Sequence, residues 1–259
     1  MAAAAATQGR VVQALMLREI KSRFGRLKLG YLWAVFEPAA FVALFAVIFA
    51  LAHQTAPSGM PVVLFMMTGI GPFMLFRNTM NQTMNAIETN RVLLTFPQVK
   101  LIDLVLARAL LEIATHTVVF FLLLAAVHAL GFAVRIENPL LVLAALACLA
   151  LTGFGLGAAF ASLVPFFRSV PQIVSIVAGR PLFFTSGLFF TAEMMPAGIR
   201  EFLLLNPILV MIEWLRSAFF VEFESRYVSV EYALGTTLFT VFLGLLMLRG
   251  LRKHILAAV

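Results

Sequence analysis

The chain lacks most of the residue types from which catalytic and metal sites are built. Of its 259 residues only 12% are charged, and Asp103 is the single aspartate. Paired-aspartate sites, which bind metal and diphosphate in membrane prenyl- and phosphatidyl-transferases, are therefore nearly excluded. The four histidines are scattered along the chain with no metal-ligand spacing; they are His53, His116, His128 and His254. The sequence gives little support to an enzyme.

Cysteine and phosphate-binding glycine loops are also scarce. Cys148 stands alone inside an apolar run, so we expect neither a disulfide framework nor a thiolate metal site. The glycines of residues 153–157 lie within an apolar run, where small residues favour close helix packing, and nothing in the chain matches a P-loop. We predict a chain that holds no metal or cofactor and cannot hydrolyse ATP by itself.

Apolar residues are abundant instead, and they predict an all-α integral membrane protein. Sixty-two per cent of the chain is hydrophobic, and about twenty apolar residues in a helix cross the hydrocarbon layer of a membrane. The first such run follows about thirty residues, too many for an ordinary signal peptide. Six runs of this kind predict six transmembrane helices at 32–52, 61–76, 110–130, 139–164, 171–190 and 233–248.

Basic residues set the orientation of these spans. Fourteen Lys and Arg residues fall on one side of the predicted membrane and four on the other, with Arg180 inside a span. Because cytoplasmic loops carry the excess of basic residues, both termini are predicted to be cytoplasmic. These residues form neither a clustered basic face nor a known nucleic-acid module, so we do not expect nucleic-acid binding.

Residues 10–28, before the first span, predict an amphipathic helix at the membrane surface. On a helix, Arg18 and Lys21 point away from the apolar side. That side is formed by Val12, Met16, Ile20, Phe24 and Leu27. Such a helix can anchor to anionic lipid through its charges, or offer a docking surface to a cytoplasmic subunit. The sequence leaves both interpretations open.

Two connections are too long to be simple turns. Residues 77–109 predict one or two short cytoplasmic helices, broken at Phe96-Pro97. The outward-facing residues 191–232 contain two apolar runs, each too short to cross, with Asn206-Pro207 breaking the helix between them. We predict a re-entrant helical hairpin that enters the outer leaflet, sheltered by protein. A pair of amphipathic helices lying flat on the surface is the alternative.

Arg180 is the residue most indicative of a transport path. An arginine near mid-membrane costs at least about 2.5 kcal/mol, and such residues usually face a wet cavity. Snorkelling to the interface or an ion pair is the alternative, with Glu37, Glu193 or Glu213 as the partner. We favour the interpretation that Arg180 lies on the transport path, and Arg180→Ala tests it by its effect on export.

Aromatic residues are a third indication of a membrane protein with a transport path. Tyr31 and Trp33 suit the interfacial belt of a membrane protein. The chain also contains 26 phenylalanines, most of which we expect to pack between helices. Some, such as Phe183 and Phe184, could line a conduit, where ring faces meet the apolar faces of sugar rings.

Two stretches resemble a known family. Arg23-Phe24, Leu29-Gly30-Tyr31-Leu32-Trp33 and Glu37-Pro38 resemble the approach to the first span in ABC-2-type polysaccharide export permeases. Residues 186–190, Asn206-Pro207 and the segment Glu213-Trp214-Leu215-Arg216 resemble the region after the fifth span. The resemblance covers essentially the whole chain. It is greatest for the inner-membrane permeases of group 2 capsular polysaccharide export, the KpsM type.

The resemblance implies a homodimer in the bacterial inner membrane, bound to two copies of a cytoplasmic ABC ATPase that carries ATP and Mg. A lipid-linked polysaccharide would pass between the protomers. A periplasmic adaptor and an outer-membrane polysaccharide exporter would continue the route. The basic residues near the entrance would attract an anionic polymer.

Residue roles follow from the same resemblance. The polymer would enter and pass along Arg23, Leu29, Gly30, Tyr31, Trp33, Arg180, Phe183 and Phe184. ATPase coupling would involve Arg18, Lys21, Arg91, Leu94, Phe96 and Pro97. A permease for O-antigen, teichoic acid or a small lipophilic substrate is the nearest alternative. A membrane-embedded glycolipid transferase is a more distant one.

Overall fold

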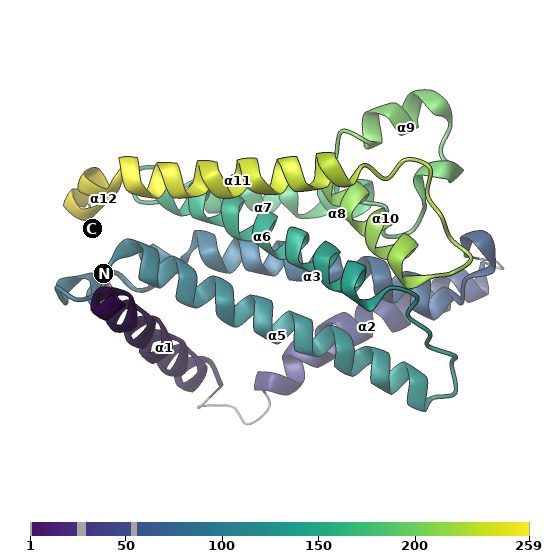
Figure 1. Cartoon of the computed structure of the whole chain (residues 1–259), viewed down its shortest axis with the longest axis horizontal. Coiled ribbons are helices and arrows are strands. Elements are labelled where there is room, and N and C mark those ends of the chain that lie inside the picture. Colours follow the sequence, from purple (N-terminus) through teal and green to yellow (C-terminus); the bar gives the residue numbers. More distant parts are fainter. Residues whose placement is uncertain (1, 25–29, 53–55, 259) are drawn as a thin grey trace.

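Five long helices dominate the computed structural model, which describes residues 2–24, 30–52 and 56–258 (Figure 1). They are α2 (Gly30–Leu51), α3 (Val62–Met84), α5 (Leu101–Ala129), α6 (Pro139–Leu163) and α11 (Val230–Gly250). Each is long and apolar enough to cross a membrane, and a bent pair, α9 and α10, makes a sixth candidate. The chain is therefore an all-helical, multi-span membrane protein.

The N-terminal helix α1 (Ala2–Phe24) and the short C-terminal helix α12 (Arg252–Ala258) lie at the same end of the bundle (Figure 1). We call this the basic end, because α1 carries Arg10, Arg18 and Lys21 and α12 carries Arg252 and Lys253. The remaining elements are η1 (Pro57–Gly59), α4 (Ala86–Thr89), η2 (Arg91–Thr95), α7 (Val170–Ala178), α8 (Arg180–Thr185), η3 (Ala192–Met194), α9 (Ala197–Leu203) and α10 (Pro207–Phe219).

Helices α3 and α6 form the centre of the bundle. They pack along each other, and α10 packs on both. In the most apolar stretch of each helix, 78% of α3 residues are buried but only 11% of α2 residues. Helix α11 contacts mainly α6 and is also largely exposed. The outer two helices therefore offer apolar faces to lipid or to another protein.

Glycines on α6 allow its close contacts on two sides. A Cβ at Gly153 would lie 2.6 Å from the Phe76 carbonyl oxygen on α3, and one at Gly157 would lie 2.7 Å from the Met80 carbonyl oxygen. Gly155 faces α11 instead, where it meets Gly244. The expectation that small residues in 153–157 serve helix packing is confirmed.

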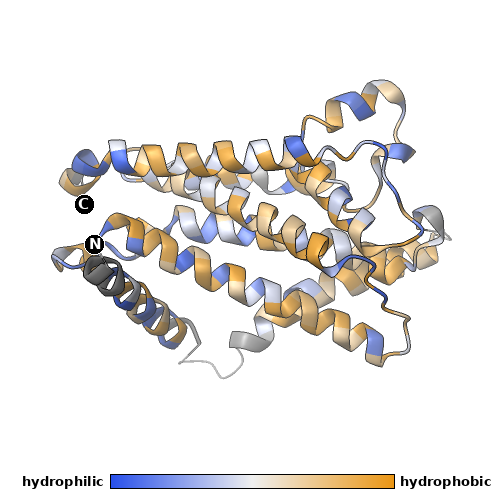
Figure 2. Cartoon of the chain, in the orientation of Figure 1, coloured by the Kyte–Doolittle hydropathy of each residue, from blue (hydrophilic) through white to orange (hydrophobic). Residues whose placement is uncertain are grey.

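Hydropathy varies along the bundle as a membrane protein requires. Apolar residues cover most of α2, α6 and α11, while polar residues gather on α1, α12 and the end connections (Figure 2). Because α1 and α12 share one end, the chain crosses the length of the bundle an even number of times. This arrangement agrees with two termini on one side of the membrane.

Two helices extend beyond the predicted spans. Helix α3 continues to Met84 rather than ending at residue 76, and α5 begins at Leu101 rather than at residue 110. The connection therefore shrinks from 77–109 to 85–100. Polar residues that suggested a loop lie on these helices and bind one another: Gln82 accepts from Arg108 Nη1 at 2.9 Å, and Asn78 donates to His116 Nε2 at 2.9 Å.

The region predicted as span 171–190 contains two short helices, α7 and α8, which meet at Gly179. Farther on, α9 and α10 are bent by 100° at the predicted Asn206-Pro207 break. Asn206 Oδ1 accepts from the Ile208 amide at 3.0 Å and so caps α10. Almost all of α10 is buried, whereas α9 is mostly exposed.

We expect Gly244→Ala to destabilise the protein, because its Cβ would meet the Gly155 carbonyl of α6. Overpacking of this kind costs about 1–3 kcal/mol. The midpoint of thermal unfolding in mild detergent should fall by several degrees. Gly235→Ala on the same helix is the control, since a Cβ there has no neighbour within 4 Å. Equal midpoints for the two variants would contradict the proposed contact.

Candidate functional site

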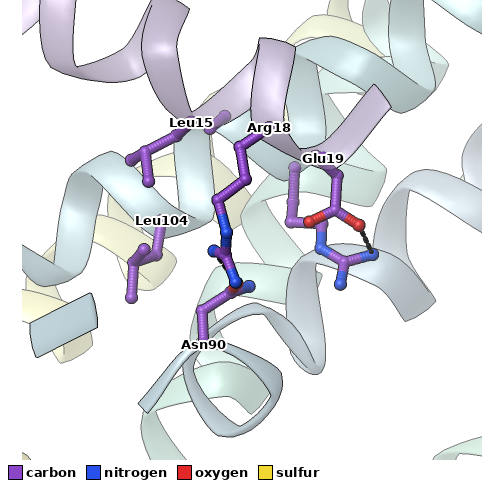
Figure 3. Close-up of a pocket in the computed structure, with 7 residues that line it drawn as sticks. Leu15, Arg18, Glu19, Asn90 and Leu104 are labelled. Atoms are coloured by element: carbon purple, nitrogen blue, oxygen red, sulfur yellow. Dashed lines mark hydrogen bonds and ion pairs between the residues drawn. The ribbon is translucent and has the colours of Figure 1, made fainter. Parts of the chain in front are cut away.

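Helix α1 is held against the basic end of the bundle by polar contacts. Arg18 Nη1 donates to Asn90 Oδ1 at 3.0 Å, and Glu19 pairs with Arg108 of α5 at 3.1 Å (Figure 3). Leu15 and Leu104 lie beside these contacts. Arg18 was predicted to point away from the apolar side of its helix. Its side chain is exposed, and its guanidinium reaches the connection after α4.

Arg108 joins four helices at this end. It lies on α5, pairs with Glu19 of α1, and donates to Gln82 of α3 at 2.9 Å and to Thr89 of α4 at 3.2 Å. Bonds to charged groups are stronger than neutral ones. Arg108 therefore links α1 to α3, which lies at the centre of the bundle.

A groove between α1 and the connection 96–99 has a volume of about 340 Å³. Arg18, Phe96 and Pro97 line it, so the structure brings together three of the predicted coupling residues. Phe96 is 57% exposed. Of the other three, Leu94 packs on the buried cluster around Ile87, Arg91 pairs with Glu88 at 3.3 Å, and Lys21 is exposed on α1.

A second polar contact lies between α2 and α3. Arg77 Nη2 donates to Glu37 Oε1 at 3.3 Å. Glu37 precedes Pro38 inside α2, in the motif singled out from the sequence. Together with the Asn78–His116 bond, this ion pair ties α2 and α5 to the central helix α3.

Phenylalanine rings gather where α2 meets α8. The ring of Phe183 contacts five others, with centroids 5.4–6.2 Å apart. The aromatic cluster consists of Phe41, Phe45, Phe73, Phe183, Phe184 and Phe189. Phe184 is 59% exposed and marks the open side of the cluster. The structure thus brings together two of the predicted channel residues.

Arg180 begins α8, three residues before Phe183, and is exposed. Within the described residues it has no acidic partner: Glu37 pairs with Arg77, and Glu213 binds elsewhere. Trp33 is exposed near the start of α2, with its ring 5.7 Å from that of Phe36. Leu29 and the side chains of Arg23 and Tyr31 lie outside the described part of the chain, and Gly30 begins α2.

The deeply buried arginine of this chain is Arg216, on α10. It is fully buried, and its guanidinium donates to the carbonyls of Gly187, Leu188 and Phe190 and to that of Phe65 on α3. Its Cζ lies 3.9 Å from the centre of the Phe65 ring. A Cβ at Gly69 would lie 2.6 Å from Arg216 Nη2, so the glycine makes room for the cation.

Glu213, one turn earlier on α10, completes this cluster. It accepts hydrogen bonds from the Ala192 amide and, at 2.6 Å, from Ser225 Oγ. Asn206 Nδ2 also donates to Ser186 Oγ at 3.1 Å. These side chains attach the loop after α8 to α10, α3 and the segment before α11. The loop turns at Gly187, where φ is +71° and glycine is favoured.

Sequence reasoning missed the roles of Arg108 and Arg216, because it counted both as loop charges that report membrane orientation. A signal existed for Arg216. Glu213 and Arg216 are the two charged residues of the otherwise apolar run 208–220. Charges three residues apart on a helix share a face, which points to a buried cluster. Arg108 gave no comparable signal.

We expect Arg216→Met to destabilise the protein by roughly 3 kcal/mol, since four buried carbonyls lose their donor and Glu213 loses the nearby positive charge. The thermal midpoint should fall, and proteolysis should increase within residues 186–192. Arg226→Met, at an exposed position in the same outer region, should change neither. Similar behaviour of both variants would contradict this role of Arg216.

Comparisons with known proteins extend these observations. Residues 10–220 match the family described as ABC-2 type transporter. The chain is 34% identical to the polysialic acid transport protein KpsM of Escherichia coli, with 95% of each chain covered. It is 28% identical to the capsule polysaccharide export inner-membrane protein CtrC of Neisseria meningitidis, over 96% of this chain and 93% of the relative. Identity with the corresponding protein BexB of Haemophilus influenzae is also 28%, over 96% and 94%.

The family match covers more than half of the chain, and the KpsM match covers nearly all of both proteins. The family match includes α1 from residue 10 onward, the aromatic cluster, Glu213 and Arg216. The chain therefore belongs to the ABC-2 type transporter family, as a membrane permease subunit that is not itself an ATPase.

Proposed function

We infer that this protein is the permease subunit of an ABC transporter that exports capsular polysaccharide across the bacterial inner membrane. The observation that carries this inference is the end-to-end likeness to three permeases whose names specify polysialic acid or capsule polysaccharide transport. An ABC-2 permease works with a separate ABC ATPase. We place ATP and Mg on that subunit.

The groove between α1 and the connection 96–99 is the proposed docking site for the ATPase. Its exposed apolar surface, from Phe96 and Pro97, lies beside the positive charge of Arg18. Lys21, Arg91 and Leu94 flank it on α1 and η2. A movement imposed here reaches the central helices through Arg18–Asn90 and through Arg108. This route would couple closure of the ATPase dimer to the spans.

The polymer path is proposed to lie between two copies of the chain. Helices α2 and α11 keep large apolar faces exposed, and a second protomer is the neighbour we propose for α2. The aromatic cluster and Arg180 would then face the path. Arg23, Leu29, Gly30, Tyr31 and Trp33 would form its cytoplasmic entrance.

On the outer side of the membrane, the bent pair α9–α10 is proposed as a re-entrant hairpin. Almost all of α10 is buried by protein, which supports its place as the inserted arm. Helix α9 exposes Ile199 and Phe202. This surface suits a periplasmic adaptor, which would connect the permease to an outer-membrane polysaccharide exporter.

Purification of the tagged chain from native membranes in mild detergent tests the assignment. Mass spectrometry should find an ABC ATPase in equal amounts, and a periplasmic adaptor with it. An ATPase without any envelope partner would favour another ABC-2 substrate, such as O-antigen, teichoic acid or a small lipophilic compound. A chain that purifies with no ATPase and turns over lipid-linked sugar would overturn the proposal in favour of a transferase.

We expect Phe96→Asp to weaken ATPase association by about tenfold, because it places a charge in an apolar contact that the proposal puts at the interface. Co-purified ATPase, measured against permease, reports the effect. Met194→Asp is the control, since Met194 is 54% exposed at the opposite end of the bundle. Unchanged ATPase recovery with Phe96→Asp would show that the groove is not the docking site.

Arg180→Ala should reduce surface polysaccharide by about tenfold, as expected when one hydrogen bond to a charged group is lost. Membrane level and ATPase association should stay unchanged, because the side chain is exposed. Arg180→Lys should restore part of the export, whereas Arg168→Ala, at another exposed arginine, should leave it intact. Normal surface polysaccharide with Arg180→Ala would refute the path.

A further inference from the structure

A second groove lies at the basic end, where α5 begins and α11 ends. Its volume is about 300 Å³. The α5–α11 groove has an apolar floor made by two residues of each helix, Leu101, Ile102, Leu245 and Leu248. Three basic residues, Lys100, Arg249 and Arg252, complete its lining. Neither the ATPase docking groove nor the aromatic cluster shares a lining residue with it.

The basic side chains at this groove are available to a ligand. Arg249 and Arg252 are exposed, and neither has an acidic partner among the described residues. Lys100 Nζ donates one bond, to Gln8 Oε1 at 2.8 Å, and two more N–H groups remain. The nearby carboxylate of Asp103 is buried and accepts from the Lys100 backbone amide and from Gln8. The lining of the groove is therefore positively charged.

The apolar floor distinguishes this groove from a cluster of basic residues that only sets the membrane orientation of the chain. Leu101 and Leu248 are buried and belong to a core cluster that includes Ile255 of α12. Leu245, one turn before Arg249, is 40% exposed. It extends the floor along α11 toward the middle of the span. A ligand that fills the groove needs a negative head and a hydrocarbon part.

We propose that the α5–α11 groove binds an anionic phospholipid. The phosphate lies between Lys100, Arg249 and Arg252, and an acyl chain follows Leu248 and Leu245 along α11. The groove lies where a transmembrane helix ends, which is the level of lipid headgroups in a membrane. Its lining contains no aromatic ring, whereas the proposed polymer path is aromatic. A resident lipid therefore fits it better than the transported glycolipid does.

This lipid would join α5 to α11, and both flank α6. Lys100 also holds Gln8 of α1. The lipid headgroup would therefore connect the docked N-terminal helix to the C-terminal end of the chain. The proposal is independent of which polymer the transporter carries.

The purified full-length chain, delipidated in neutral detergent, tests the proposal. Phosphatidylglycerol and phosphatidylcholine of equal chain length are titrated, and bound lipid is counted by native mass spectrometry. We expect phosphatidylglycerol to bind at least about tenfold more tightly than phosphatidylcholine, because three basic side chains attract its negative charge. Equal affinity for the two lipids would overturn the proposal, and this comparison needs no variant.

Two triple variants of equal charge locate the site. Lys100→Gln, Arg249→Gln and Arg252→Gln together should abolish the preference for phosphatidylglycerol. Arg168→Gln, Arg226→Gln and Lys253→Gln together should keep it, because these exposed residues lie outside the groove. Equal loss in both variants would mean attraction by net charge alone and refute the site. Displacement of the lipid by inorganic phosphate at comparable concentration would identify a free-phosphate site instead.

Discussion

The segment between α8 and α10 depends on one buried guanidinium. Carbonyls that are buried away from water need donors from the protein. Arg216 supplies them to three carbonyls of the loop after α8 and to one of α3. The loop can then be short, non-helical and buried at the same time. Arg180, Phe183 and Phe184 lie on α8 directly before this loop, and Phe189 lies within it.

Firmly and loosely packed helices are separated in this fold. Helices α3, α6 and α10 form a tight centre, in which the glycines of α6 bring backbones together. Helix α2 lies outside it, is mostly exposed and is attached to α3 through contacts that include Glu37–Arg77. Helix α11 is also largely exposed, but it packs closely along α6, where Gly155 meets Gly244. The Arg108 contacts connect that centre to α1 at the basic end.

Hydropathy and helix-breaking residues were sufficient to predict most elements. The apolar runs, the Asn206-Pro207 break and the role of the α6 glycines follow from local chemistry. The ends of α3 and α5 did not, because Asn78, Gln82 and Arg108 are polar residues that pair with one another across two helices. Arg216 was counted as a loop charge for the same reason. Whether a charged residue is buried or exposed depends on partners distant in sequence, which no local pattern contains.

Membrane insertion of this chain must proceed in an order that its hydropathy dictates. Helix α2 has a mean hydropathy of 2.3 and can wait alone in lipid after synthesis, because few of its residues need a protein neighbour. Helix α3 has a mean hydropathy of only 1.3 and carries Arg77, Asn78 and Gln82. Glu37 of α2 pairs with Arg77, but Asn78 and Gln82 find their partners, His116 and Arg108, only after α5 arrives. The central helix of the finished protein is thus the one that depends most on helices synthesised after it.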